Sequence, residues 1–260
     1  MRLAVLCDIH GNLPALEAVV GEVGEASVDR VVVGGDVVPG PMVRESLALL
    51  LGLNVPVDFI YGNGEAAVLE AMAGRDYRAL PAEYRPLIRW MAAQLYPGYE
   101  PLLAAWPKTF QLEIPGLGRA LFCHGTPRDE NEIFTKSTPE DLLLPVFGDL
   151  EADLVVCGHT HMQFDRMIGT TRVVNAGSVG MPFGAPGADW LLLGPGVDLR
   201  HTAYDLDDAA WRIRATAYPQ AAEFAAKYVL QPPTEVAMLE AFTFAHFKRQ
   251  PAGGRGEIRN

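Results

Sequence analysis

The stretch RLAVLCDIHGN, residues 2–12, sets the architecture of the chain. Its apolar run stops at Asp8, and a short polar turn leads into LPALEAVVGEVG (13–24), whose apolar residues recur at helical spacing. A short apolar run of this kind is typical of a strand that is covered on both faces of its sheet. The same order recurs twice, as strand 28–36 with helix 43–51 and as strand 55–63 with helix 64–74. This alternation predicts βαβ units and a largely parallel sheet.

The composition is that of a globular protein, with 49% hydrophobic and 20% charged residues in a chain of 260. A net charge of −11 argues against non-specific binding to nucleic acid, because phosphate backbones repel an acidic surface. No apolar run is long enough to span a membrane, and the opening run is too short for a signal peptide. The cysteines, Cys7, Cys123 and Cys157, are odd in number and not paired in spacing, so we expect a reducing, cytoplasmic location.

The rest of the chain divides into three parts. Residues 75–108 are rich in Pro, Tyr and Trp and predict a helical insertion or lid; a helical pair that completes the core is the alternative. From residue 109 the pattern becomes β-rich and predicts a second sheet, more mixed or antiparallel than the first. Its expected strands are 109–114, 119–123, 153–157, 171–175, 189–194 and 198–204. Residues 207–248 return to helix and end in an amphipathic segment. We therefore expect a single domain over 1–248 and a flexible tail over 249–260.

Polar clusters follow the apolar strands. They are CDIHGN (7–12), GGD (34–36), GN (62–63), CHG (123–125), CGHTH (157–161) and NAGS (175–178). Because ligand sites in α/β sheets lie beyond the carboxyl ends of the strands, these clusters are expected to meet in one crevice. They supply carboxylate, amide and imidazole donors: Asp8, His10, Asp36, Asn63, His124, His159 and His161. Such a set suits Mn²⁺, Fe or Zn²⁺ and is large enough for two ions that share a carboxylate.

Each donor taken alone also has an ordinary structural role. These roles are helix capping for Asp8 and Asn63, turn formation for His10 and Asp36, and core hydrogen bonding for His124. The pair His159 and His161 stands two residues apart and therefore shares one face of an extended chain. We interpret the cysteines as small buried residues rather than ligands. The occurrence of every cluster at a strand end favours a metal site over the separate roles.

The ordered motifs D-x-H, G-D, G-N, a lone His and G-H-x-H resemble those of the calcineurin-like metallophosphoesterases. The similarity extends over residues 7–161 and is strongest to small bacterial and archaeal members of the phosphodiesterase or protein-phosphatase type. It implies an α/β fold of four layers, an αββα sandwich in which helices flank two mixed β-sheets. It also implies two metal sites: Asp8, His10, Asp36 and His161 for one ion, and Asp36, Asn63, His124 and His159 for the other. Mn is the metal we expect, with Fe, Zn, Ni and Co as alternatives, and a bridging water or hydroxide would attack phosphorus.

The chain departs from the family pattern at Gly64, where a His usually follows G-N. That imidazole contacts the phosphate and helps to protonate the leaving oxygen, a contribution of about 10²–10⁴-fold. Three explanations stay open: a leaving group that needs little protonation, as in a phosphodiester or nucleotide anhydride; a proton from another residue; or a degenerate enzyme. If the missing acid is limiting, Gly64→His should raise activity on poor leaving groups.

Arg128, His201 and Tyr84 are the candidates for the replacement group. The planar guanidinium of Arg128 suits phosphate oxygens, although an ion pair with Asp129 or Glu130 is an equal alternative.

The sequence thus predicts a dinuclear-metal-dependent hydrolase of a small phosphodiester or phosphorylated metabolite, with Asp36, Asn63, His124 and Arg128 as its catalytic residues. One alternative is a protein-serine/threonine phosphatase, which the absence of G-N-H-E and of nearby arginines disfavours. The other is a non-catalytic metal-binding scaffold that contacts its partner through the aromatic segment 80–106. A homo-oligomer is compatible with the sequence.

Overall fold

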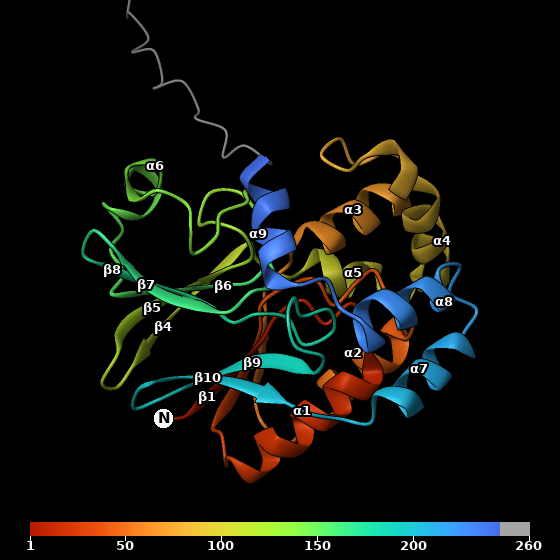
Figure 1. Ribbon diagram of the computed structural model, residues 1–260, viewed down its shortest axis with the longest axis horizontal. Helices are drawn as coiled ribbons and strands as arrows, with labels where there is room; N and C mark the ends of the chain where they lie inside the picture. The colour runs from red at the N-terminus through yellow and green to blue at the C-terminus, as the bar shows by residue number, and fades with distance from the viewer. Residues whose placement is uncertain (245–260) are drawn as a thin grey trace, which may run out of the picture.

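The computed structural model describes residues 1–244, and two five-stranded sheets stacked face to face form its centre (Figure 1). The first sheet has the order β10-β9-β1-β2-β3, and the second has the order β4-β5-β6-β8-β7. The first sheet comprises β1 (Leu3–Leu6), β2 (Arg30–Val33), β3 (Val57–Phe59), β9 (Ala188–Leu193) and β10 (Val197–Thr202). The second comprises β4 (Thr109–Ile114), β5 (Gly118–Cys123), β6 (Leu154–Cys157), β7 (Phe164–Ile168) and β8 (Thr171–Asn175). Helices flank the pair, so the predicted four-layer α/β fold with mixed sheets is confirmed.

The helices are distributed over both outer faces and the loops between strands. They are α1 (Leu13–Glu25), α2 (Val43–Leu51), α3 (Asn63–Met72), α4 (Arg85–Leu95), α5 (Glu100–Ala104), α6 (Glu140–Phe147), α7 (Leu206–Arg214), α8 (Ala221–Phe224) and α9 (Glu235–Phe244), with a 3₁₀ turn η1 (Ala82–Tyr84) and a π-helical segment η2 (Ala225–Leu230). None of these helices is long and apolar enough to cross a membrane. The predicted tail at 249–260 lies outside the described residues.

Both sheets are mixed. The strands β1, β2 and β3 are parallel, whereas β9 runs antiparallel to β1 and β10 antiparallel to β9. In the second sheet β5, β6 and β8 are parallel, and β4 and β7 are antiparallel edge strands. The prediction that all strands after residue 109 form the second sheet is therefore wrong for β9 and β10, which return to the first sheet. The alternate side chains of β9 explain this position: Leu191 and Leu193 pack between the sheets, and Trp190 and Leu192 pack under the helices.

Two elements were not predicted from the sequence. The helix α6 carries an internal proline, Pro145, which obscures its pattern, and β7 is an edge strand with three largely polar or exposed central positions. The two elements contact each other, and Leu143 and Phe147 of α6 join Ile168 of β7 in a small separate core cluster.

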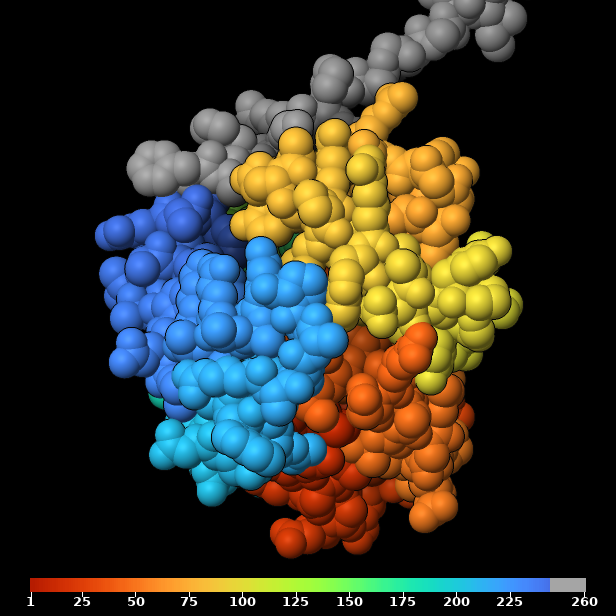
Figure 2. Space-filling model, turned by 90° about the vertical axis from the view of Figure 1, so that its right-hand side faces the viewer, coloured from red at the N-terminus to blue at the C-terminus, as the bar shows by residue number. Residues whose placement is uncertain are grey.

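The insertion at 75–108 folds as η1, α4 and α5. Leu95 and Leu103 of these helices are buried in the same core cluster as α1 and α2, so the insertion completes the helical layer over the first sheet. Figure 2 shows this layer from outside, where the insertion adjoins the N-terminal part of the chain and the C-terminal helices. A hollow of about 280 Å³ is lined by residues of 40–45, α4 and the segment 216–218.

The predicted helical region 207–248 folds as α7, α8, η2 and α9 up to residue 244, and its last four residues lie outside the described range. In α9 the half-buried positions Glu235, Met238, Leu239 and Phe242 fall on one helical face.

Candidate metal centre

The loops that follow five strands meet at one end of the stacked sheets. Asp8 and His10 follow β1, Asp36 follows β2, and Asn63 follows β3; from the second sheet, His124 follows β5, and His159 and His161 follow β6. Backbone hydrogen bonds join these loops: the N–H of Asp8 donates to the carbonyl of Gly35 (3.0 Å), and that of Gly158 donates to the carbonyl of His124 (2.9 Å). The expected convergence of the strand-end clusters is therefore present.

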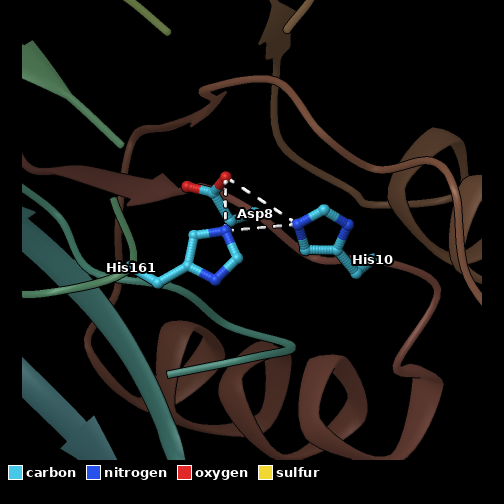
Figure 3. A group of neighbouring side chains, drawn as sticks. All are labelled: Asp8, His10 and His161. Carbon is cyan, nitrogen blue, oxygen red and sulfur yellow. Dashed lines mark hydrogen bonds and ion pairs between the residues drawn. The ribbon is translucent and has the colours of Figure 1, made fainter. Parts of the chain in front are cut away.

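Three imidazole nitrogens surround one carboxylate oxygen of Asp8. Its Oδ1 lies 3.1 Å from Nε2 of His161 and 3.9 Å from that of His10 (Figure 3). The Nε2 of His124 lies 3.8 Å from the same oxygen. None of these contacts has the alignment of a hydrogen bond, and Oδ1 is buried without a hydrogen-bond partner. The Nε2 atoms of His10 and His161 also face each other at 3.3 Å. Lone pairs that converge in this way are typical of the ligands of a cation.

Asp36 presents one oxygen to each half of the site. Its Oδ2 lies 3.8 Å from Nε2 of His10, and its Oδ1 lies 3.5 Å from Nε2 of His124. Asp8, His10 and His161 form one compact group of donors, and Asp8, Asp36 and His124 form another. The carboxylate common to these two groups is Asp8, whereas the resemblance implies Asp36 as the shared ligand; Asp36 meets both halves of the site through its two oxygens.

Asn63 and His159 complete the second group. The Oδ1 of Asn63 lies 3.0 Å from Nε2 of His124, and the rings of His124 and His159 lie 5.0 Å apart. The Nε2 of His159 is buried without a partner. The capping alternatives do not hold, because α3 begins at Asn63 with Gly62 as its N-cap, and Asn12 rather than Asp8 caps α1.

Backbone carbonyls fix the orientation of three rings. The Nδ1 of His10 bonds to the carbonyl of Pro39 (3.2 Å), that of His124 to the carbonyl of Gly34 (2.9 Å), and that of His161 to the carbonyl of Met181 (2.9 Å). Since a carbonyl oxygen only accepts, each Nδ1 carries a proton, and Nε2 is the ring nitrogen that faces the site and can coordinate a metal. Metal-binding histidines are oriented in this way.

The backbone of the candidate ligands is strained. Asp8 (φ 54°), His10 (47°), Asp36 (53°), His159 (66°) and His161 (57°) all have left-handed conformations. Ser27 is the one other non-glycine residue with positive φ among residues 1–244. Left-handed backbone costs a residue with a side chain about 1–2 kcal/mol, and such strain concentrates at functional sites. No feature of the sequence pattern reveals it.

A family model described as the calcineurin-like phosphoesterase superfamily domain matches residues 1–193. The chain belongs to this superfamily. Its motif order, its paired mixed sheets and its donors at strand ends agree with that assignment, and the family is metal-dependent. The chain beyond residue 193, which includes β10 and α7 to α9, lies outside the matched region.

Two solved structures are similar in fold to this calcineurin-like phosphoesterase. A hypothetical protein from Pyrococcus horikoshii OT3, PH1004, has a TM-score of 0.72 at 21% identity over 90% of this chain and 99% of its own. A metallophosphoesterase from Sphaerobacter thermophilus has a TM-score of 0.68 at 24% identity over 88% of this chain and 100% of its own. Comparison with curated proteins finds no match.

The residues of the centre fit divalent cations. Burial by itself would raise the pKa of Asp8 and of Asp36, but neighbouring imidazoles lower both pKa values below the usual range, so the carboxylates are ionised. Burial and the proximity of His124 lower the pKa of His159 to about 4, which leaves its Nε2 lone pair free. The unpartnered Oδ1 of Asp8 and Nε2 of His159 would otherwise each cost free energy in a buried site, and a bound cation would satisfy both.

Glu65 is a central residue of this superfamily member that the sequence analysis did not single out. Its buried carboxylate accepts hydrogen bonds from the N–H groups of Asp36 (2.8 Å), Val38 (3.1 Å) and Gly62 (2.7 Å). It thereby joins the loops after β2 and β3. One feature of the sequence could have indicated this role: Glu65 is a charged residue in the first turn of an otherwise largely apolar helix, two positions after the candidate ligand Asn63.

The NAGS segment supports the ligands rather than joining them. The Ser178 hydroxyl donates to the carbonyl of Asp8 (2.7 Å), and the Asn175 amide donates to the carbonyl of Gly158 (2.6 Å). Cys7, Cys123 and Cys157 are buried free thiols whose pKa values are raised, chiefly by burial, in agreement with the prediction that they are not ligands.

Gly64 does not leave an empty space for an imidazole. A β-carbon there would lie 2.0 Å from the carbonyl oxygen of Val38 and 3.0 Å from Oδ1 of Asp36. The Gly64 N–H also donates to Oδ1 of Asp36 at 2.7 Å. An imidazole at residue 64 would require the loop after β2 to move, so the structure gives a steric reason to expect that Gly64→His does not raise activity.

The candidates for a replacement group differ in their partners and exposure. Arg128 forms a bidentate ion pair with Glu132, not with Asp129 or Glu130 as the alternative had it, and its role as a phosphate clamp stays a prediction. His201 on β10 bonds to Asp189 of β9 (2.7 Å) and to the carbonyl of Pro186 (3.2 Å). Tyr84 is exposed at the end of η1.

Proposed function

We propose that the chain is a dinuclear-metal-dependent phosphoester hydrolase that acts on a small phosphodiester or phosphorylated metabolite. The observation that carries this proposal is the convergence of strained carboxylate and imidazole donors from five strand ends on the unpartnered Oδ1 of Asp8. Asp8, His10, Asp36 and His161 would hold one ion, and Asp36, Asn63, His124 and His159 the other. When bound, such ions neutralise phosphate charge and lower the pKa of a water molecule that can attack phosphorus.

The protein's own residues contribute orientation and charge. Asp36 would serve both ions, because its two oxygens face opposite halves of the site. Asn63 adds a neutral oxygen, which keeps the second half of the site more electron-poor than a further carboxylate would. Glu65 holds the N–H groups of Asp36 and Gly62, and through them the spacing of the two loops.

The surroundings of His161 favour a small substrate. The ring of Phe183 stacks on His161 at a centroid distance of 5.0 Å, and Phe242 of α9 lies 6.3 Å from Phe183. An ion pair between Lys136 and Glu235 (2.6 Å) fixes the start of α9 to the loop after β5. The C-terminal helix thus lies beside the flank of the centre at His161 and limits access from that side.

The absence of a side chain at Gly64 favours a diester or another substrate with a good leaving group. Residue 64 cannot donate a proton, and an alcohol of low pKa leaves without general-acid assistance. Mn²⁺ is the metal we propose.

The test is metal-dependent turnover. Purified protein loaded with Mn²⁺ should hydrolyse bis(p-nitrophenyl) phosphate faster than p-nitrophenyl phosphate, and Asp36→Asn should abolish both activities. Asp149→Asn, which changes an exposed aspartate on the surface, is the matched control. A protein that binds two metal ions but turns over neither ester would support the scaffold alternative, and activity confined to phosphopeptides would support the protein phosphatase.

A further inference from the structure

An open cleft of about 900 Å³ lies beside the metal centre, between α3, the segment 75–79 and the loop after β5. Its walls carry the rings of Tyr61 and Tyr77, the guanidinium groups of Arg75 and Arg78, and the carboxylates of Glu70 and Glu130. No residue of the candidate metal centre lines it. The cleft is a separate space that the proposed hydrolysis does not by itself explain.

The helix α3 connects this cleft with the metal centre. Asn63 is its first residue, and Ala66 and Glu70, which line the cleft, fall on the same helical face at three and seven residues further on. With a rise of about 1.5 Å per residue, the cleft extends from about 5 to 10 Å beyond Asn63 along the helix. Tyr61, two residues before Asn63, lines the same wall. A substrate whose phosphate sits at the centre would place its organic group here.

Tyr77 is held in place from the opposite wall. Its hydroxyl accepts a hydrogen bond from the Asn131 side-chain amide (2.7 Å) and donates to Glu130 (3.3 Å). Glu130 in turn pairs with Lys108 at 3.0 Å. Because these two hydrogen bonds hold the Tyr77 hydroxyl, the ring has a fixed position in the wall of the cleft.

The two arginines of the cleft differ in whether they form an ion pair. Arg75 is paired with Glu70 through two hydrogen bonds of 2.8 Å, so its charge is offset. Arg78 is exposed and forms no ion pair with another residue of the described range 1–244. A guanidinium with no carboxylate partner can stack on a planar ring or bond to its polar edge.

We propose that this cleft binds an aromatic ring of the substrate, separated from phosphorus by a spacer of several bonds. The substrate would then be a phosphodiester in which the group retained on phosphorus is a nucleoside or a comparable ring-bearing alcohol, and the other alcohol is the leaving group. The two tyrosine rings supply stacking surfaces, the distance from Asn63 sets the spacer, and Arg78 meets the polar edge of the ring. The inference rests on the proposed phosphoester hydrolysis for the position of the phosphate.

The test compares two non-hydrolysable ligands, one with and one without the aromatic base: the phosphonate analogues of adenosine 5′-monophosphate and of ribose 5-phosphate. Their affinities for the Mn²⁺-loaded, full-length protein are measured by titration calorimetry. The nucleoside analogue should bind at least about tenfold more tightly, because stacking on an aromatic side chain favours each base by about that factor or more.

Variants locate the effect. Tyr77→Leu and Tyr61→Leu should each reduce the ratio of the two affinities toward one and leave the affinity for the ribose analogue unchanged; Arg78→Ala should reduce the ratio about threefold. Tyr77→Phe, which keeps the ring, should retain most of the ratio if Tyr77→Leu fails to fold. Trp211→Leu removes an exposed aromatic residue of α7 outside the cleft and should leave the ratio unchanged.

The outcomes separate this inference from the proposed function. Equal affinities of the two analogues, loss of binding of both, or a ratio that Tyr61→Leu and Tyr77→Leu leave intact would overturn the cleft assignment. A ring-dependent ratio in a protein that hydrolyses no phosphoester would support the cleft as a binding site and refute the proposed reaction instead.

Discussion

Replacement of Gly64 by alanine tests whether the loop after β2 really excludes a side chain from the site. The added β-carbon would lie 2.0 Å from the carbonyl oxygen of Val38, where ordinary van der Waals contact begins at 3.4 Å. The contact is with backbone, so it cannot be relieved by rotation of a side chain. The loop must move, and the N–H of Val38 bonded to Glu65 (3.1 Å) and Oδ1 of Asp36 bonded to the Gly64 N–H (2.7 Å) must move with it.

The magnitude follows from this overlap. Overpacking of a well-packed site costs about 1–3 kcal/mol, which outweighs the gain of up to about 1 kcal/mol from replacing glycine by alanine in a helix. We therefore expect Gly64→Ala to lower the urea midpoint of the EDTA-treated protein by roughly 0.5–1 M. The same displacement moves Asp36, so metal content after dialysis against limiting Mn²⁺ should fall below that of the wild type.

Gly21→Ala is the matched control. Gly21 lies within α1, and no atom lies within 4 Å of the β-carbon it would gain. This variant should become more stable by about 0.5–1 kcal/mol, because alanine loses less backbone entropy in a helix. If Gly64→Ala were as stable as Gly21→Ala and bound its full complement of metal, the steric account of residue 64 would be refuted, and the missing imidazole would be a simple loss.

Three further predictions concern the centre itself. Asp36→Asn should lower the metal content of both sites together, and elemental analysis that still finds two ions per chain would contradict its role as the shared ligand. Glu65→Gln should destabilise the protein by about 1–3 kcal/mol. The carboxylate accepts hydrogen bonds from backbone N–H groups through both of its oxygens, whereas a glutamine would turn an NH₂ donor toward one set of them. An unchanged urea midpoint would refute this. Mn²⁺ binding near pH 7 should release about one proton from His124. Burial lowers the pKa of His124, but the charges of Asp36 and Asp8 outweigh this effect and raise it to about 10. The ring is therefore protonated in the metal-free protein and must lose that proton to coordinate; the pKa of His161 is also raised, because the charge of Asp8 outweighs burial. Calorimetry in buffers of different ionisation enthalpy measures the release, and a binding enthalpy independent of buffer would contradict it.

The sequence predicts the centre well where local pattern and connectivity decide the outcome. The strand, turn and helix order of the first 74 residues, and the position of each donor after a strand, follow from periodicity and from the geometry of parallel sheets. The return of β9 and β10 to the first sheet does not follow, because the pairing partner of a strand is set by tertiary packing and β9 is apolar on both faces. The helix α6 was missed because Pro145 contradicts the local helical pattern.

The roles of Gly64 and Glu65 were out of reach for a different reason. Both depend on the backbone of a second loop: the carbonyl of Val38 excludes a side chain at residue 64, and the N–H groups of Asp36 and Val38 bind the carboxylate of residue 65. A motif in the sequence states which residues are present and not which space the neighbouring loop leaves open. The absence of His at residue 64 therefore indicated a missing function, whereas the structure indicates a different packing of the same loop.

The close packing of the loops holds the candidate ligands in their strained backbone conformations. Left-handed backbone at Asp8, His10 and Asp36 persists only where the surroundings hold it, since each such residue costs about 1–2 kcal/mol. Here the surroundings are close backbone contacts: a β-carbon at Gly40 would lie 1.7 Å from the carbonyl oxygen of His10, and one at Gly180 would lie 1.8 Å from that of Ile9. Loops in such contact cannot relax independently. The donors are thus held near their binding positions by the packing of the loops themselves, which lowers the entropic cost of gathering them around the ions.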